Sequence, residues 1–162
     1  YAPIQLSRYV TTVANSGTCY DLTLIDQVKD VNGNVILDNH AKVRNKVNIA
    51  NSTWKAVHNG MYRVVNGSRS SIGSMFSGMK VKIAGKTGTA QQSKLHANHA
   101  YFVSYAPYKN PEISVTCVIP NGFTSSNAAQ TARDVYKYYF SKNKKKVSGK
   151  IKMPESNTTH TD

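Results

Sequence analysis

The chain has 162 residues, of which 40% are hydrophobic and 18% are charged, and its formal net charge is +13. These values are typical of one folded domain rather than a disordered segment. No apolar run approaches the ~20 residues that a membrane-spanning helix needs. A basic surface attracts polyanions in general, but on charge alone we favour a solvated surface that has no specific partner.

The first predicted element is a helix that starts near Pro3 and ends at Asn15-Ser16-Gly17. Apolar residues recur at helical spacing through this stretch, proline is favoured in a first helical turn, and glycine often follows a last one. Because the sequence has no initiator methionine and begins abruptly at this helix, we expect it to be one piece of a longer protein.

Residues 18–47 predict short strands and turns. Asn32-Gly33, between Val31 and the apolar residues 35–37, is a typical β-hairpin turn. The aspartates near this hairpin are better interpreted as turn residues than as the carboxylate pair of a glycosidase. They are Asp21, Asp26, Asp30 and Asp38.

A second helix is predicted to begin near Asn51 or Ser52, either of which can cap it, and to end at Asn66-Gly67. Its apolar face carries Trp54, Val57, Met61, Val64 and Val65. Residues 67–78 are rich in serine and glycine, so we expect a flexible loop there.

Three strands then follow, at residues 80–92, 99–106 and 113–119. The short links between them favour an antiparallel meander, and the middle segment, apolar on both faces, suits a central strand. A last helix is predicted at residues 127–140. Its buried stripe is Ala128, Ala132, Val135, Tyr136 and Tyr139.

The predicted fold class is α+β, a three-stranded antiparallel sheet segment packed with helices. Residues 1–140 form one unit, and residues 141–162 form a basic, polar tail whose six lysines predict loose packing. Cys19 and Cys117 are the only cysteines. They are interpreted as two small buried side chains, while the alternative of a disulfide stays open. The sequence has no cysteine or histidine spacing typical of a structural metal site.

The stretch that points to chemistry is Lys86-Thr87-Gly88-Thr89. Lys86 is a positive charge suited to a carboxylate, the two threonines offer hydroxyl donors, and Gly88 lets another backbone approach closely. Together they predict an edge strand on which an anionic peptide lies as an added strand. Strict alternation places Lys86 on the opposite face from Thr87 and Thr89.

Lys-Thr-Gly is also one element of the signature of serine β-lactamases and penicillin-binding proteins. Here it is followed by a strand that begins His99-Ala100-Tyr101-Phe102 and preceded by Pro3-Ile4-Gln5-Leu6 and Gly60-Met61. In this order, over residues 1 to about 140, the chain resembles the C-terminal part of the transpeptidase domain of class B penicillin-binding proteins.

The resemblance implies a partial penicillin-binding or serine β-lactamase-like transpeptidase fold at the extracytoplasmic face of the cell membrane. Its partners would be peptidoglycan stem peptides, β-lactams and the N-terminal remainder of the same protein, which would hold the membrane anchor. It implies no cofactor, no metal and no nucleic acid.

In that family a serine of a Ser-x-x-Lys motif is acylated by a D-Ala-D-Ala peptide or by a β-lactam. The resemblance implies that Lys86 supports the substrate carboxylate electrostatically and that the two threonine hydroxyls bind it. The backbone N–H of Thr89 would form half of the oxyanion hole. The implied substrate-binding residues are Lys86, Thr87, Gly88, Thr89 and Gln91.

The nucleophile itself is not expected in this chain. Ser-x-x-Lys occurs three times, from Ser52, Ser77 and Ser141, which is near the number that chance predicts, and none stands far upstream of Lys86 as in the family. The isolated chain is therefore predicted to be inactive. Two alternatives stay open, a β-lactam sensor domain of the same fold and a basic scaffold that binds a polyanion.

Overall fold

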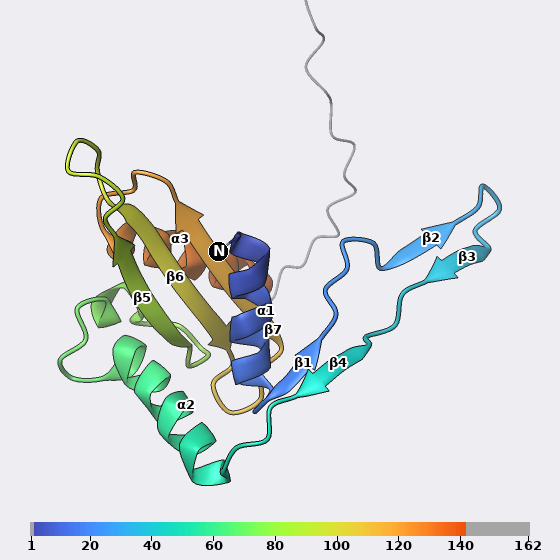
Figure 1. The fold of residues 1–162 in the computed structure, drawn as a ribbon, viewed down its shortest axis with the longest axis horizontal. Coiled ribbons are helices and arrows are strands. Elements are labelled where there is room, and N and C mark those ends of the chain that lie inside the picture. Colours follow the sequence, from blue (N-terminus) through green and yellow to red (C-terminus); the bar gives the residue numbers. More distant parts are fainter. Residues whose placement is uncertain (1, 142–162) are drawn as a thin grey trace, which may run out of the picture.

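The computed structural model describes residues 2–141; the basic tail predicted from residue 142 onward lies outside the described residues. Its centre is a three-stranded antiparallel sheet in the order β5-β6-β7 (Figure 1). The strands are β5 (Ala84–Ala90), β6 (His99–Ala106) and β7 (Ile113–Ile119). The predicted α+β class is confirmed, with β6 in the centre and β5 at an edge of the sheet.

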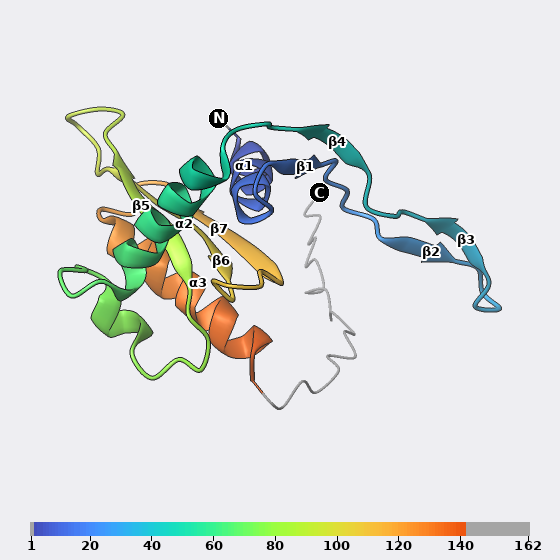
Figure 2. The ribbon, with the colours of Figure 1, turned by 90° about the horizontal axis from the view of Figure 1, so that it is seen from below.

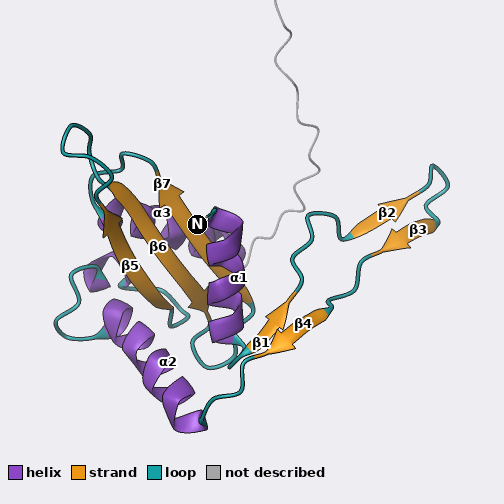
Figure 3. Cartoon of the chain, in the orientation of Figure 1, coloured by secondary structure: helices purple, strands orange, loops and turns teal. Residues whose placement is uncertain are grey.

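Helices cover both faces of this sheet (Figure 3). They are α1 (Pro3–Ala14) and α2 (Asn51–Asn66) on one side and α3 (Ser125–Tyr139) on the other. Because successive side chains of β6 point to opposite faces, Phe102 packs in the core beneath α3, whereas Tyr105 packs with Val10 and Trp54 beneath α1 and α2. The two cores explain why β6 is apolar on both faces.

The helix ends follow the sequence only in part. The chain after α1 turns through Ser16 and Gly17 in left-handed backbone conformations, as predicted. At the start of α2, however, the capping residue is Ala50, which makes no side-chain cap bond, so the predicted cap by Asn51 or Ser52 is wrong. Burial of the apolar face of α2 supplies the stability that a cap would have added.

The segment after α2 is more ordered than its composition suggests. It contains a short 3₁₀ helix, η1 (Gly73–Phe76), and the side chains of Ile72 and Phe76 are buried in the core beneath α3. The prediction of a flexible loop is therefore wrong here, because two apolar anchors outweigh the serines and glycines around them. Two smaller predictions also fail: β5 begins at Ala84 rather than residue 80, and Val135 is exposed.

Between α1 and α2 the chain forms two small antiparallel pairs. β1 (Thr18–Tyr20) pairs with β4 (Val43–Lys46), and β2 (Gln27–Lys29) pairs with β3 (Val35–Asp38), which confirms the predicted hairpin. Residues 21–42, called the arm below, project away from the helices and the sheet in both views (Figures 1 and 2).

The tip of the arm is a turn organised by Asp30. Its carboxylate accepts hydrogen bonds from the side-chain amide of Asn34 at 2.8 Å and from the backbone N–H groups of Asn32 and Asn34. These bonds, the first of them above all, hold the pKa of Asp30 below its usual value. The arm carries four of the chain's eight acidic residues. These four are the aspartates interpreted above as turn residues.

The two cysteines do not form a disulfide in the structure. Cys19 lies buried in β1 and Cys117 is half-buried in β7, and both are free thiols. Burial raises the pKa of the Cys117 thiol, so it stays protonated and packs as a small apolar side chain.

Two buried tyrosines on opposite sides of the sheet differ in how their hydroxyl groups are satisfied. The Tyr136 hydroxyl donates a hydrogen bond to Ser104 Oγ at 2.9 Å. Tyr105, a residue that is 1% exposed, has a buried hydroxyl with no hydrogen-bond partner in the described part of the chain. Burial raises the pKa of both phenols, that of Tyr105 to about 12.

This difference predicts opposite responses to the same substitution. Tyr136→Phe should lower the free energy of unfolding of the chain by about 1 kcal/mol, because a buried hydrogen bond is lost. Tyr105→Phe should leave it unchanged or raise it slightly, because removing an unpaired polar atom from a core relieves a desolvation cost. Urea unfolding followed by circular dichroism measures both, and a greater loss for Tyr105→Phe would contradict the assignment.

Candidate functional site

The predicted substrate-binding motif lies on the free edge of the sheet. β5 pairs with β6 alone within the described residues, with Lys86 opposite Val103 and Thr87 opposite Phe102. Its other edge therefore presents alternate backbone N–H and C=O groups outward. The prediction of an edge strand is confirmed, and this edge is the one on which an extended peptide could add as a further strand.

Lys86 is exposed, and its ammonium group donates a hydrogen bond to the carbonyl oxygen of Thr87 at 2.7 Å. Lys86 and Gly88 share the face of the sheet that packs on α1 and α2, and Thr87 and Thr89 share the opposite face, as the alternation predicts. A single ligand can therefore contact both the charge and the hydroxyls only if it lies along the outer edge of the strand.

Two glycines of β5 leave space that side chains of β6 occupy. A Cβ atom on Gly85 would lie 2.5 Å from Cζ of Phe102, and one on Gly88 would lie 3.2 Å from Cβ of Tyr101. The ring of Phe102 thus occupies the space that a side chain at Gly85, the residue before the motif, would fill. Gly85 is a residue that sequence reasoning missed, and its position directly before Lys86 was the available signal.

The end of β5 lies against the start of α3. The backbone N–H of Ser125 donates a hydrogen bond to Thr89 Oγ1 at 3.4 Å. Ser125-Ser126-Asn127 therefore lies beside the motif, although it follows Lys86 in the chain. Its asparagine is already engaged, because the Asn127 amide donates to the carbonyl oxygen of Gly122 at 2.9 Å.

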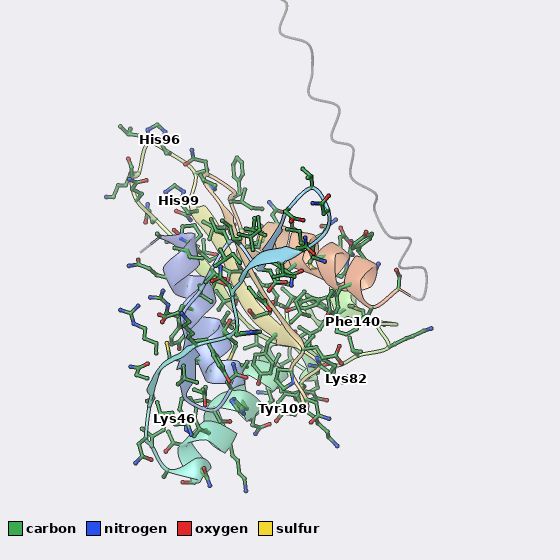
Figure 4. All side chains as sticks on the ribbon, turned by 90° about the vertical axis from the view of Figure 1, so that its right-hand side faces the viewer. Lys46, Lys82, His96, His99, Tyr108 and Phe140 are labelled. Atoms are coloured by element: carbon green, nitrogen blue, oxygen red, sulfur yellow. The ribbon has the colours of Figure 1, made fainter. Side chains whose placement is uncertain are left out.

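Gln91, the last predicted site residue, follows β5 and is exposed. Its neighbour Gln92 is held more firmly. His99 Nδ1 accepts a hydrogen bond from the backbone N–H of Asn121 at 2.9 Å, so His99 Nε2 carries the hydrogen and donates it to Gln92 Oε1 at 2.7 Å. This histidine ties the loops at one end of the sheet, where Figure 4 also shows His96.

At the opposite end of β5, backbone pairing continues beyond the strand. The N–H of Tyr108 donates to the carbonyl oxygen of Lys82 at 2.7 Å, and Figure 4 shows these two residues near each other, far from His99. Lys80 and Lys82 are exposed and precede β5, so they lie before the motif rather than in it.

Ser52 and Ser77, whose Ser-x-x-Lys matches lie wholly within the described residues, are not hydrogen-bonded to the lysines of their matches, and Lys144 of the Ser141 match lies outside the described residues. Ser77 follows η1, Ser141 follows α3 and donates to the carbonyl oxygen of Tyr138, and Ser52 lies in the exposed first turn of α2. Among the described residues, no serine hydroxyl is hydrogen-bonded to a lysine amine.

An α+β fold whose sheet edge carries Lys-Thr-Gly-Thr defines the class of penicillin-binding and serine β-lactamase-like proteins. The family model of the penicillin binding protein transpeptidase domain matches residues 1–137, and the chain belongs to this family. The resemblance expected from the sequence is thereby confirmed.

Its relatives include penicillin-binding protein 2B of Streptococcus pneumoniae, 34% identical over 151 residues, which cover 86% of this chain and 22% of the relative. The peptidoglycan D,D-transpeptidase MrdA of Haemophilus influenzae is 40% identical over 103 residues, covering 54% of this chain and 16% of the relative. The solved structure of penicillin-binding protein 2B from S. pneumoniae strain R6 matches with a TM-score of 0.75 at 32% identity, covering 88% of this chain and 26% of that one.

The chain thus spans about a quarter or less of the length of these relatives. In the part of the chain that the structure describes, no helix combines the length and the apolar character needed to cross a membrane.

Proposed function

We propose that this chain forms the C-terminal part of a peptidoglycan D,D-transpeptidase that cross-links stem peptides through an acyl-serine intermediate. The observation that carries the proposal is the placement of Lys86-Thr87-Gly88-Thr89 on the free edge of β5. The similarity to a peptidoglycan D,D-transpeptidase over half of the chain supports it. The nucleophilic serine and the membrane anchor belong to the remainder of the protein. The transpeptidase domain lies at the extracytoplasmic face of the membrane.

In this proposal the serine Oγ attacks the carbonyl carbon of the penultimate D-Ala, and the terminal D-Ala leaves as the amine. The acyl group then passes from the serine to the amine of a second stem peptide. A β-lactam acylates the same serine by ring opening. The chain described here does not carry out bond breaking itself, but binds the peptide and stabilises the charge that develops on its carbonyl oxygen.

The motif residues divide this work. The stem peptide lies along β5, and the Lys86 ammonium supports its terminal carboxylate. The Thr89 hydroxyl already accepts a hydrogen bond from Ser125, which leaves its own hydrogen to be donated to a ligand oxygen. Thr87 contributes a second hydroxyl, and the backbone N–H of Thr89 stabilises the oxyanion. Gln91, which is exposed just beyond the strand, contacts the same peptide.

The experiment that tests this function uses the full-length protein that contains the chain. We expect covalent labelling by a fluorescent penicillin, and release of D-Ala from a peptide ending in D-Ala-D-Ala with transfer of the acyl group to an added amine. Absence of both reactions would contradict the proposal. Labelling without acyl transfer would favour the β-lactam sensor of the same fold.

The isolated chain, in contrast, should not be labelled by the same penicillin. Among the residues that the structure describes, no serine hydroxyl is hydrogen-bonded to a lysine amine that could accept the proton of an attacking hydroxyl. Gel fluorescence after incubation with the penicillin measures this, and the full-length protein serves as the positive control. Stoichiometric labelling of the chain that Ser52→Ala or Ser77→Ala abolishes would show that one of these serines is a nucleophile after all.

A further inference from the structure

A groove of about 820 Å³ lies beside the motif, between the C-terminal end of α2, the segment that follows it, and β5. Its lining contains two arginines, Arg63 and Arg69, and its only residue from β5 is Thr87. Hydroxyl groups supply much of the remaining lining, from Ser68, Ser70 and Ser71. The groove therefore joins a pair of positive charges to the strand on which the peptide is proposed to lie.

Neither arginine is neutralised within the described residues. Arg63 and Arg69 take part in none of the ion pairs or side-chain hydrogen bonds there, and no aspartate or glutamate lines the groove. The C-terminal end of α2 contributes partial negative charge, which Arg63, in its last turn, offsets. Two guanidinium groups beside several hydroxyls form a site whose chemistry suits an oxyanion.

The segment that presents Arg69 is fixed relative to β5. Ser70 Oγ donates a hydrogen bond to the carbonyl oxygen of Val64 at 2.5 Å, and Ile72, a residue that is 1% exposed, is anchored in the core. The Asn66 amide donates to the carbonyl oxygen of Ile83 at 2.7 Å, directly before β5. The backbone that carries the two arginines is therefore already fixed before a ligand binds to β5. This lowers the conformational entropy that is lost on binding.

We propose that this groove is a subsite for a second carboxylate of the peptide bound along β5, so that the protein prefers stem peptides that are acidic away from their C-terminus. This inference rests on the proposed function and deepens it. A peptide carboxylate is favoured over a free phosphate or a phosphate polymer because Thr87 belongs both to the groove and to the peptide-binding edge.

The test measures binding rather than turnover, with two synthetic pentapeptides that both end in D-Ala-D-Ala. One carries an additional side-chain carboxylate, and the other carries the same group as an amide. Nuclear magnetic resonance titration of the isolated chain at constant ionic strength gives both dissociation constants. We expect the acidic peptide to bind about tenfold more tightly, since a charge-assisted hydrogen bond contributes more than a neutral one.

The ratio of the dissociation constant of the amide peptide to that of the acidic peptide measures the preference for acid. In the double variant Arg63→Gln/Arg69→Gln this ratio should fall to about 1, since in the groove only the arginines distinguish acid from amide. The matched control is Lys55→Gln/Lys109→Gln, which removes the same charge from exposed positions outside the groove and should keep the ratio. Melting temperatures verify that each variant is folded.

Several results would overturn the inference. These are a ratio near 1 in the wild-type chain, an equal fall of the ratio in both double variants, or no binding of either peptide up to its solubility limit. Tighter binding of a glycerol phosphate polymer, lost with Arg63 and Arg69 alone, would reassign the groove to phosphate. Failure of the proposed function itself would be seen separately, as absence of penicillin labelling of the full-length protein.

Discussion

Lys86→Ala in the full-length protein that contains this chain is expected to slow β-lactam acylation by roughly ten- to two-hundred-fold, while the melting temperature stays nearly unchanged. Lys86 is exposed on the free edge of β5, so its side chain contributes little to the core. Its charge, in contrast, would face a ligand carboxylate, and one charge-assisted hydrogen bond is worth about 1.5–3 kcal/mol, or one to two decades of rate.

Lys80→Ala and Lys82→Ala are the controls for this experiment. Both lysines are exposed and precede β5 in the same stretch of chain, so they match Lys86 in residue type and neighbourhood. Each should cost far less than Lys86 in the second-order rate constant of acylation. If Lys86→Ala is acylated as fast as these controls, the assignment of the strand as a substrate-binding element is wrong.

Gly17→Ala should destabilise the chain by about 2–4 kcal/mol, which corresponds to a fall in melting temperature of roughly 5–15 °C. Gly17 has a φ of +99°, where an L-residue is strained. A Cβ atom there would overlap the carbonyl oxygen of Val47 and lie 2.8 Å from Cζ2 of Trp54. Neither neighbour can move easily, since Val47 pairs with Gly17 through its backbone and Trp54 is packed in the core.

The matched control is Gly33→Ala, in the turn of the arm. Gly33 has a similar φ of +88°, but a Cβ atom there would meet nothing within 4 Å. It should therefore show the backbone cost alone, about 1 kcal/mol. Thermal unfolding followed by circular dichroism compares the two variants. Equal losses would mean that the crowding around Gly17 is relieved by small shifts of its neighbours.

Sequence patterns predicted those elements that the spacing of apolar residues and the choice of turn residues determine locally. The helical spacing gave α1, the Asn32-Gly33 turn gave the hairpin, and the apolar stretch at residues 99–106 gave the central strand. The edge position of the Lys86 motif followed from residue chemistry and was also correct. The helix, the turn and the central strand depend on neighbours within a few residues along the chain.

Features set by contacts distant in sequence were predicted poorly. The start of β5 depends on where β6 stops pairing, and the packing of residues 67–78 depends on a core to which α3 contributes. The hydrogen bonds of His99 join residues from two different loops. Arg63 and Arg69 line the same groove only because the chain turns between them. Local spacing cannot show such contacts, because they arise only when the elements pack together.

The projecting arm also gives the molecule an uneven distribution of charge. Residues 21–42 contain four of the eight acidic residues of the chain but only two of its 21 lysines and arginines, Lys29 and Lys42. Because the arm extends away from the sheet and helices, its aspartates are separated in space from the basic residues of the described sheet and helices (Figure 2). The described residues thus form an electric dipole, and we expect it to favour an approach to a polyanionic surface in which the sheet and helices face the surface and the hairpin points away.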